Sequence, residues 1–189
     1  MYLFFDTETT GLPKNWNAPY TDVDNWPRLV QLAYILFDEA GEELECKDII
    51  VKPEGYTIPT EASDIHGITH DIALQKGIPI TEALSWFNQA SNGAVEFVAH
   101  NIKFDRAIMT SEFHRAEYVE PFGTKTRTCT MTSTTKFCGL KNIRGLKWPK
   151  LQELHEKLFG YKFAEAHNAL IDIKVTANCF WELKRMEII

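Results

Sequence analysis

Two carboxylates lie two residues apart near the start of the chain, in the segment 6–12, DTETTGL. If this segment begins on a strand, the side chains of Asp6 and Glu8 point to the same face, because successive strand residues alternate between faces. Two like charges at the end of a buried strand repel each other and lose hydration, which destabilises the fold unless a cation joins them. Carboxylate oxygens suit Mg²⁺ or Mn²⁺. The pair alone indicates a metal site only weakly, and the continuation TTGL is far more specific.

Two further acids and one histidine lie later in the chain. Asp105 ends the segment 100–105, HNIKFD, where a helix should begin, so it could be a helix cap or a first-turn acid. Asp172 ends the segment 167–172, HNALID. Residues five apart are about 140° apart on a helix, so we expect His167 in the preceding loop and Asp172 on the helix. A loop histidine with a pKa near ~6.5 suits a general base at neutral pH, although such a residue is ordinarily just part of the surface.

The elements that must position these residues can be read from the apolar pattern. Strands are expected at 2–6, 29–38 and 44–52, the last two joined as a hairpin through the turn 38–41, and short strands at 95–99 and near 126–130. Helices are expected at 81–92 with Thr81 as cap, at about 105–118, from Leu151 to Gly160, and at about 169–185. This order predicts an α/β domain around one mixed sheet. The polar segment 13–27 is a long loop that could form one lip of the site.

Length and composition set outer limits on the fold and location. The 189 residues suit one compact domain, 1–189, and 44% hydrophobic with 24% charged residues is typical of an ordinary globular protein. No apolar run approaches the ~20 residues of a membrane helix, and the N-terminal segment lacks the features of a signal peptide. A cytoplasmic location is therefore expected. The four cysteines form no close pair, so buried free thiols are expected rather than a structural zinc site.

Charge is distributed unevenly along the chain. The net charge is −6, but the segment 121–152 contains seven Lys and Arg residues and no acid, which leaves −13 (−6 minus +7) for the rest. A positive face on an acidic protein can guide a polyanion to one site. The alternative is an ordinary solvated loop and helix face. Lys141, Arg144 and Lys147 are the residues that would test whether this segment contacts a nucleic-acid strand.

In combination, DTETTGL, HN-x-x-FD and H-x-A-x-x-D occur in this order, and the chain resembles the DEDDh family of 3′→5′ exonucleases, which includes proteins similar to the proofreading epsilon subunit and to ribonuclease T. The resemblance covers nearly the whole chain and includes IHGIT at 65–69. A sister branch has Tyr four residues before the last Asp, where this chain has Asn168, and His167 marks the histidine branch. The resemblance implies a ribonuclease H-like fold with a central mixed five-stranded sheet flanked by helices.

The resemblance also implies a set of site residues. Asp6 would bridge two divalent metal ions, Mg²⁺ or Mn²⁺, while Glu8 and Asp172 complete one metal site and Asp105 supports the other, directly or through water. His167 would deprotonate the attacking water. This agrees with the general chemistry of two cations ~3.5–4 Å apart, which stabilise both oxygens of an in-line phosphodiester displacement. The implied substrate contacts are Thr7, Thr9, Gly11, Leu12, His66, Asn101 and Phe104.

Some of these residues also fit a structural role. Leu12 could equally belong to the core. Phe104, Trp148 and Trp181 are expected in the core rather than against a cofactor. The spacing of His66 and His70 could suggest a metal site, but the intervening Gly67 favours a turn.

The activity implied by the resemblance is metal-dependent hydrolysis at the 3′ end of nucleic acid, with release of 5′-mononucleotides. Single-stranded DNA is the favoured substrate, and an exoribonuclease or an oligonucleotide-degrading enzyme is the alternative, because discrimination through the 2′-OH is not visible in the sequence. A catalytically silent nucleic-acid-binding module is a further alternative, although all five catalytic positions are intact. A polymerase partner or a homodimer stays open.

Overall fold

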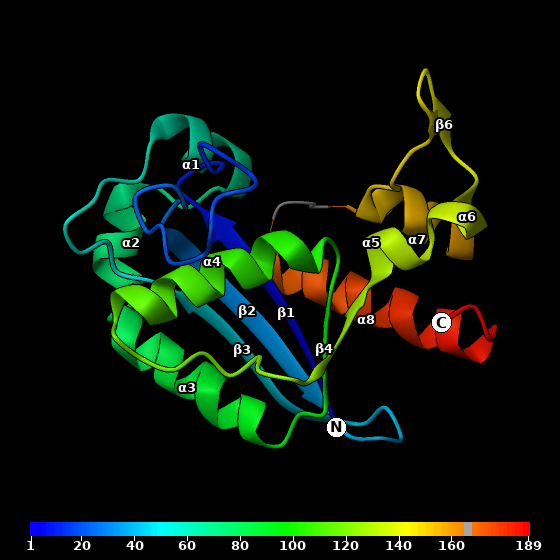
Figure 1. The fold of residues 1–189 in the computed structure, drawn as a ribbon, viewed down its shortest axis with the longest axis horizontal. Helices are drawn as coiled ribbons and strands as arrows, with labels where there is room; N and C mark the ends of the chain where they lie inside the picture. The colour runs from blue at the N-terminus through cyan, green and yellow to red at the C-terminus, as the bar shows by residue number, and fades with distance from the viewer. Residues whose placement is uncertain (165–167) are drawn as a thin grey trace.

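The computed structural model describes residues 1–164 and 168–189. Its centre is a five-stranded sheet in the order β3-β2-β1-β4-β5 (Figure 1). The strands are β1 (Tyr2–Thr9), β2 (Leu29–Phe37), β3 (Glu43–Ile50), β4 (Glu96–Ala99) and β5 (Thr126–Cys129). β2 is antiparallel to both β1 and β3, whereas β4 is parallel to both β1 and β5. The expected mixed five-stranded sheet is confirmed.

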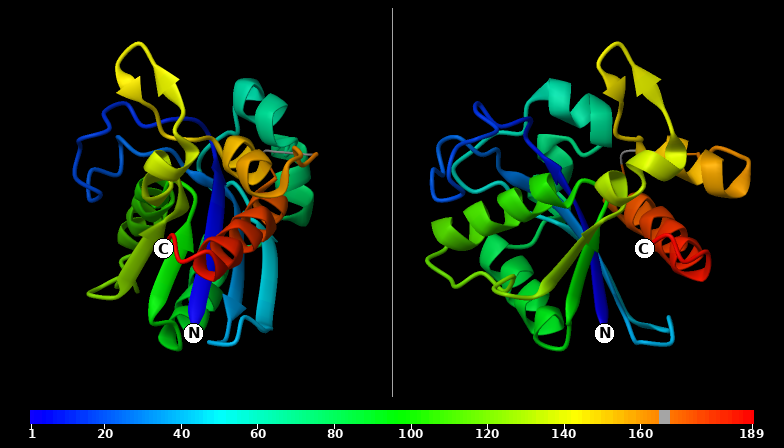
Figure 2. Two further views of the ribbon diagram at one scale, coloured as in Figure 1. Left: turned by 90° about the vertical axis from the view of Figure 1, so that its right-hand side faces the viewer. Right: turned by 45° about the vertical axis from the view of Figure 1, so that its right-hand side comes forward.

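Helices cover both faces of this sheet (Figure 2). α3 (Ile80–Asn92) and α4 (Ile102–Arg115) pack on the face that carries Leu3 and Phe5 of β1. α8 (Ala169–Arg185) packs on the opposite face, where Phe180 contacts Phe4 of β1 with the ring centroids 5.1 Å apart. The period-two alternation of β1 therefore assigns its odd residues to the α4 face and its even residues to the α8 face. Asp6 and Glu8 therefore lie on the α8 face and Thr7 on the α4 face.

Smaller elements lie outside this three-layer body. They are α1 (Thr60–His66), α2 (His70–Lys76), α5 (Thr130–Ser133), α6 (Thr135–Cys138), α7 (Leu151–Phe159) and a hairpin of β6 (Lys141–Asn142) and β7 (Gly145–Leu146). Of these, only α7 was expected from the apolar pattern. It packs against α8 in a second apolar cluster that includes Leu154 and Leu183.

Several element boundaries differ from those expected. The helix expected at 81–92 with Thr81 as its cap begins at Ile80 and has Pro79 as its N-cap, with a φ of −56°. Proline has no backbone N–H to donate, so it is tolerated at the start of a helix, where no helical hydrogen bond is needed from that residue. α4 begins at Ile102 rather than about Asp105, since Asn101 adopts a left-handed conformation, φ 75°, that starts the helix directly after β4. Asp105 is therefore a first-turn acid and not a cap. The bounds of α8 agree with the sequence pattern.

Within the described residues, no helix combines the length and the apolar composition needed to cross a membrane. All four cysteines are free thiols; Cys138 and Cys179 are buried as expected, whereas Cys46 and Cys129 are only partly buried.

Candidate active site

Three carboxylates converge at the end of β1 and the start of α8. Asp6 and Glu8 are even residues of β1 and point to the α8 face, where Asp172 lies in the first turn of that helix. One carboxylate oxygen from each of the three lies within 4.8 Å of the others. The structure thus brings together residues that are more than 160 positions apart in the chain (172 minus 8).

The position of Asp172 depends on how α8 begins. Asn168 is the N-cap of α8, and its side-chain Oδ1 accepts a hydrogen bond from Ile171 N at 3.2 Å. The buried Gln31 of β2 accepts a hydrogen bond from Ala169 N at 3.4 Å, and its own amide donates to Asp48 Oδ1 at 2.6 Å. These contacts tie the first turn of α8 to β2, which is paired with β1 beside Glu8.

Asp105 lies on the other side of β1. Its Oδ1 accepts hydrogen bonds from the backbone N of Thr7, at 3.1 Å, and from the Thr7 hydroxyl, at 2.8 Å. Thr7 is an odd residue of β1 and faces α4, so Asp105 approaches the strand from the face opposite Asp172. The group of three converging carboxylates therefore does not include Asp105, whose predicted role beside a second metal ion stays a prediction.

The electrostatics of the site oppose ionisation of these acids in the absence of a cation. Burial raises the pKa of Asp6 well above its ordinary value, and the charges of Asp105, Asp172 and Glu8 raise it further. Burial, followed by the charges of Asp172 and Asp105, raises the pKa of Glu8 to about 8. Burial raises the pKa of Asp105 to about 7, although the hydrogen bonds from Thr7 act in the opposite direction. A divalent cation would relieve this repulsion, and an all-oxygen donor set of this kind fits Mg²⁺ or Mn²⁺.

A pocket of about 620 Å³ opens beside the converging carboxylates. Asp6 and Asp172 line it together with Asn101 and Trp148. Trp148 was expected in the core, and that expectation is wrong, because its side chain is 64% exposed. The segment LKWPK that contains it has lysines on both sides of the tryptophan and a proline directly after it, which is the signal that could have indicated a surface position. Trp181, in contrast, packs edge-on against Tyr2 as a core residue should.

His100 also lines this pocket, and the motif analysis did not assign it a role. Its Nε2 lies 3.1 Å from the backbone oxygen of Pro149, and its Nδ1 lies 2.9 Å from the hydroxyl of Thr130. Burial lowers the pKa of His100 to about 4, so the ring is neutral at neutral pH. A carbonyl oxygen can only accept, so Nε2–H donates to Pro149 and Nδ1 accepts from Thr130. Both ring nitrogens are therefore occupied, and His100 has no lone pair available for a proton from water.

The residues after Glu8 form the start of the expected substrate-binding segment. Thr9 is buried, and its hydroxyl donates to the backbone oxygen of Gly11 at 2.7 Å. Gly11 has a φ of 147°, which favours glycine. Leu12 is 72% exposed, so the alternative that it belongs to the core is wrong. It is available for contact with a base.

The other expected substrate contacts differ in accessibility. His66 is buried, and its Nδ1 accepts a hydrogen bond from Ile68 N at 3.1 Å, within the turn that Gly67 makes between α1 and α2. This geometry confirms the turn in IHGIT. Asn101 lines the pocket. Phe104 is partly buried against the core, and its ring centroid lies 5.8 Å from that of Trp16. His167, the predicted general base, lies outside the described residues.

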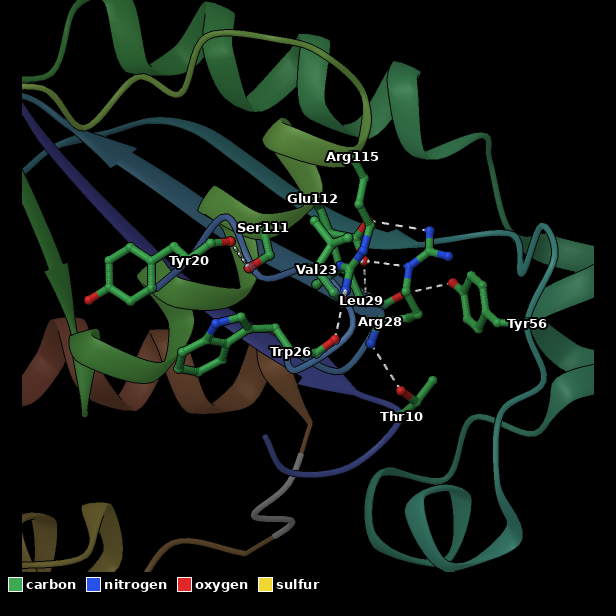
Figure 3. Close-up of polar contacts among 10 residues, drawn as sticks. All are labelled: Thr10, Tyr20, Val23, Trp26, Arg28, Leu29, Tyr56, Ser111, Glu112 and Arg115. Atoms are coloured by element: carbon green, nitrogen blue, oxygen red, sulfur yellow. Dashed lines mark hydrogen bonds and ion pairs between the residues drawn. The ribbon is translucent and has the colours of Figure 1, made fainter. Parts of the chain in front are cut away.

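The loop 13–27 is fixed to α4 by polar contacts, as Figure 3 shows. Glu112, two helical turns after Asp105, is 1% exposed and accepts hydrogen bonds from Arg28 Nε at 2.9 Å and from Leu29 N at 3.0 Å. Arg115 lies 2.9 Å from the same carboxylate and also donates to backbone oxygens of the loop, one of them that of Trp26 at 2.6 Å. One face of α4 therefore anchors both the end of the loop and, through Asp105, the strand that carries the converging acids.

The mixed-sheet α/β fold of this chain defines a class that is shared with solved nuclease structures. Solved structures of Escherichia coli exonuclease I have this fold: the complex with a dT13 oligonucleotide is 22% identical, with a TM-score of 0.77, and the zinc-bound complex with single-stranded DNA is 23% identical, with a TM-score of 0.75. In both cases the alignment covers 97% of this chain and 40% of exonuclease I.

The sequence comparison identifies the family. A model of the ribonuclease T family, described as exonuclease, matches residues 3–180. The 3′-5′ exonuclease DinG of Bacillus subtilis (strain 168) is 27% identical over 182 residues, which are 96% of this chain and 17% of DinG. The chain belongs to this exonuclease family, the DEDDh 3′→5′ exonucleases. It spans less than half the length of each of these relatives.

Proposed function

We propose that the protein is a metal-dependent 3′→5′ exonuclease that hydrolyses the terminal phosphodiester bond of single-stranded nucleic acid, with DNA favoured, and releases 5′-mononucleotides. The observation that carries this proposal is the convergence of Asp6, Glu8 and Asp172 within 4.8 Å beside an open pocket. Family membership supports the same reaction class.

The residues divide the work as follows. Asp6, Glu8 and Asp172 would hold one divalent ion, Mg²⁺ or Mn²⁺, and Asp105 would support a second beside Asp6. When bound, such ions stabilise the charge on the attacking and leaving oxygens of the phosphodiester. Thr7 orients Asp105 through its two hydrogen bonds. Asn101 and Leu12 border the space for the terminal nucleotide.

We assign the general base to His167. Among the described residues, His100 is the histidine that lines the pocket, and both of its ring nitrogens are occupied. A base must have a free lone pair within reach of the attacking water. The sequence position of His167, one residue before the cap of α8, supports its placement near Asp172.

The direct test uses purified protein and a 5′-labelled single-stranded oligonucleotide. With Mg²⁺ or Mn²⁺ the labelled strand should shorten one nucleotide at a time, and EDTA should stop the reaction. Asp6→Asn should abolish hydrolysis, and equal cleavage by this variant would show that a contaminating nuclease is responsible. His167→Ala should reduce turnover at least ~100-fold, the lower end for loss of a general base, while calorimetry shows that Mn²⁺ binding persists. Full turnover in that variant would remove His167 from its assigned role.

The choice of DNA over RNA is the finer part of this proposal. Two of the similar exonuclease I structures are complexes with the DNA oligonucleotides dA16 and dT13, which supports single-stranded DNA here. Initial rates on matched DNA and RNA strands, single- and double-stranded, test it. Faster hydrolysis of RNA would favour the exoribonuclease alternative. The cytoplasmic location, the single domain and the possible polymerase or homodimer partner stay predictions.

A further inference from the structure

The β6–β7 hairpin projects from the body of the protein (Figure 2). Lys141 pairs with Leu146 and Asn142 with Gly145, which leaves Ile143 and Arg144 as a two-residue tip. The tip is held by a hydrogen bond from Arg144 N to Asn142 Oδ1 at 2.8 Å. Gly145 has a φ of 109°, which a side chain would strain. We call residues 140–148 the hairpin segment.

The hairpin segment exposes large apolar side chains. Ile143 is 101% exposed, Leu146 49% and Trp148 64%. Single exposed apolar residues are common, but three within six positions on a projecting element, one of them Trp, indicate a contact surface. Trp148 lines the same pocket as Asp6 and Asp172, so this surface continues into the candidate site.

The charge of the hairpin segment complements a polyanion. Lys141 and Arg144 are exposed, and neither is in an ion pair with a described residue. Lys147 is partly neutralised by Glu153, whose Oε1 lies 2.5 Å from Lys147 Nζ. Lys125 and Arg127 belong to the same acid-free stretch but lie at the start of β5, at the end of the sheet away from Glu8. The basic stretch is therefore not one face, and only its later part adjoins the site.

The base of the hairpin segment is fixed to the sheet. Lys147 N donates to the backbone oxygen of Leu140 at 2.9 Å, which closes the hairpin. The next two residues are Trp148 and Pro149, and the oxygen of Pro149 accepts the hydrogen bond from His100 at the end of β4. Trp148 is therefore held by neighbours on both sides at a defined place relative to the carboxylates.

We propose that the hairpin segment binds the single strand that leads into the site, with Trp148 stacked on a base near the scissile end and Lys141 and Arg144 against phosphates further from it. An aromatic platform beside a cationic track is the arrangement by which proteins bind single strands without sequence preference. This inference rests on the proposed function for its substrate class. It adds where the strand runs and which side chains hold it.

Binding and hydrolysis are measured separately, so that the two proposals can fail independently. Fluorescence anisotropy of a labelled single-stranded DNA of about 15 nucleotides, near the upper site size of one single-strand-binding fold, is recorded in EDTA, where no hydrolysis occurs. Trp148→Ala should weaken binding about 5- to 150-fold, the range for loss of one base–aromatic stack. Trp148→Phe should restore most of the affinity. Tyr118→Ala removes an exposed aromatic residue beyond the far end of α4 and should change nothing.

Salt dependence tests the cationic part. Each lost phosphate contact lowers the slope of log affinity against log salt concentration by ~0.7 for single strands, so the double variant Lys141→Gln, Arg144→Gln should lower it by about 1.4. The matched control Lys52→Gln, Lys76→Gln removes two exposed lysines elsewhere and should keep the wild-type slope. Equal affinity for Trp148→Ala and an unchanged slope for the double variant would overturn the inference. Absence of metal-dependent hydrolysis by the wild type, with these binding results intact, would instead overturn the proposed function.

Discussion

Without metal, the variant Glu8→Gln should be more stable than the wild type, and the difference in stability should increase as the pH rises. Burial and the charges of Asp172 and Asp105 raise the pKa of Glu8 from 4.5 to about 8. Folding therefore favours the protonated carboxyl, whose contribution to stability is complete below pH 4.5 and is lost as the pH rises through about 8. Gln has the shape of the protonated acid and cannot ionise, so the stability of the variant should not decrease with pH for this reason.

The size of the effect follows from the same pKa values. The interval from 4.5 to about 8, at ~1.36 kcal/mol per pH unit, sets an upper limit of roughly 5 kcal/mol. Glu8 is partly exposed, and its neighbours change protonation over the same interval, so we expect about 1–2 kcal/mol in favour of the variant. In a chain of this length that difference corresponds to about 2–8 °C in Tm.

Thermal unfolding followed by circular dichroism measures this prediction. Wild type, Glu8→Gln and the control Glu42→Gln, an exposed acid in the β2–β3 turn, are compared in EDTA at several pH values across the interval. The advantage of Glu8→Gln should grow with pH, whereas the control should follow the wild type. Added Mn²⁺ should reduce the difference in Tm between Glu8→Gln and the wild type, because a cation stabilises the ionised carboxylates of the wild type. If the wild type lost no stability relative to Glu8→Gln, the repulsion inferred for this site would be refuted.

Three further substitutions test how the site is supported. Thr7→Val removes the hydrogen bond from the Thr7 hydroxyl to Asp105. Because a hydrogen bond to a charged group contributes about 1.5–3 kcal/mol, both Tm and Mn²⁺ affinity should fall. Unchanged Mn²⁺ affinity would show that Asp105 does not support the metal site. Glu112→Gln should lower the free energy of unfolding, measured with urea, by about 3–5 kcal/mol, because it breaks a buried ion pair. The control Glu182→Gln, at the exposed pair with Arg185, should have no measurable effect. A larger loss of stability in the control than in Glu112→Gln would contradict the assigned burial. Asn168→Ala removes the N-cap of α8 and should lower the free energy of unfolding by ~1 kcal/mol; it should also lower Mn²⁺ affinity, because the cap positions Asp172. Asn178→Ala changes an exposed residue inside α8 and is the control. Equal effects of the two substitutions would argue against capping by Asn168.

The sequence predicts the part of the fold that is set by local pattern. α8 was expected with its observed bounds because Ala169, Ile173, Ala177 and Phe180 repeat at helical spacing, and all four are buried. The shared face of Asp6 and Glu8 follows from strand geometry alone. A local sequence pattern does not show which face of the sheet a later helix covers. The placement of Asp105 on the face opposite Asp172 depends on that choice, so it had to come from the structure.

The hairpin segment shows a second limit. Each of its strands has two residues, too few to show alternation, and its turn has Ile and Arg rather than the Asn-Gly pair that signals a tight hairpin. Trp148 was expected in the core rather than against a cofactor, yet its side chain is 64% exposed. The lysines on both sides of it, Lys147 and Lys150, and Pro149 directly after it were the better guide to a surface position.

The wide separation of Asp6 and Glu8 from Asp172 along the chain has a consequence for biosynthesis. Until α8 has docked on β1 and β2, Asp172 cannot join Asp6 and Glu8, and the group of three converging carboxylates cannot form. A nascent polypeptide that still lacks α8 is thus expected to be harmless to nearby nucleic acid, including that of the ribosome. On the proposed function, nuclease competence arises only once α8 has been synthesised and has docked, which makes this docking step an intrinsic safeguard.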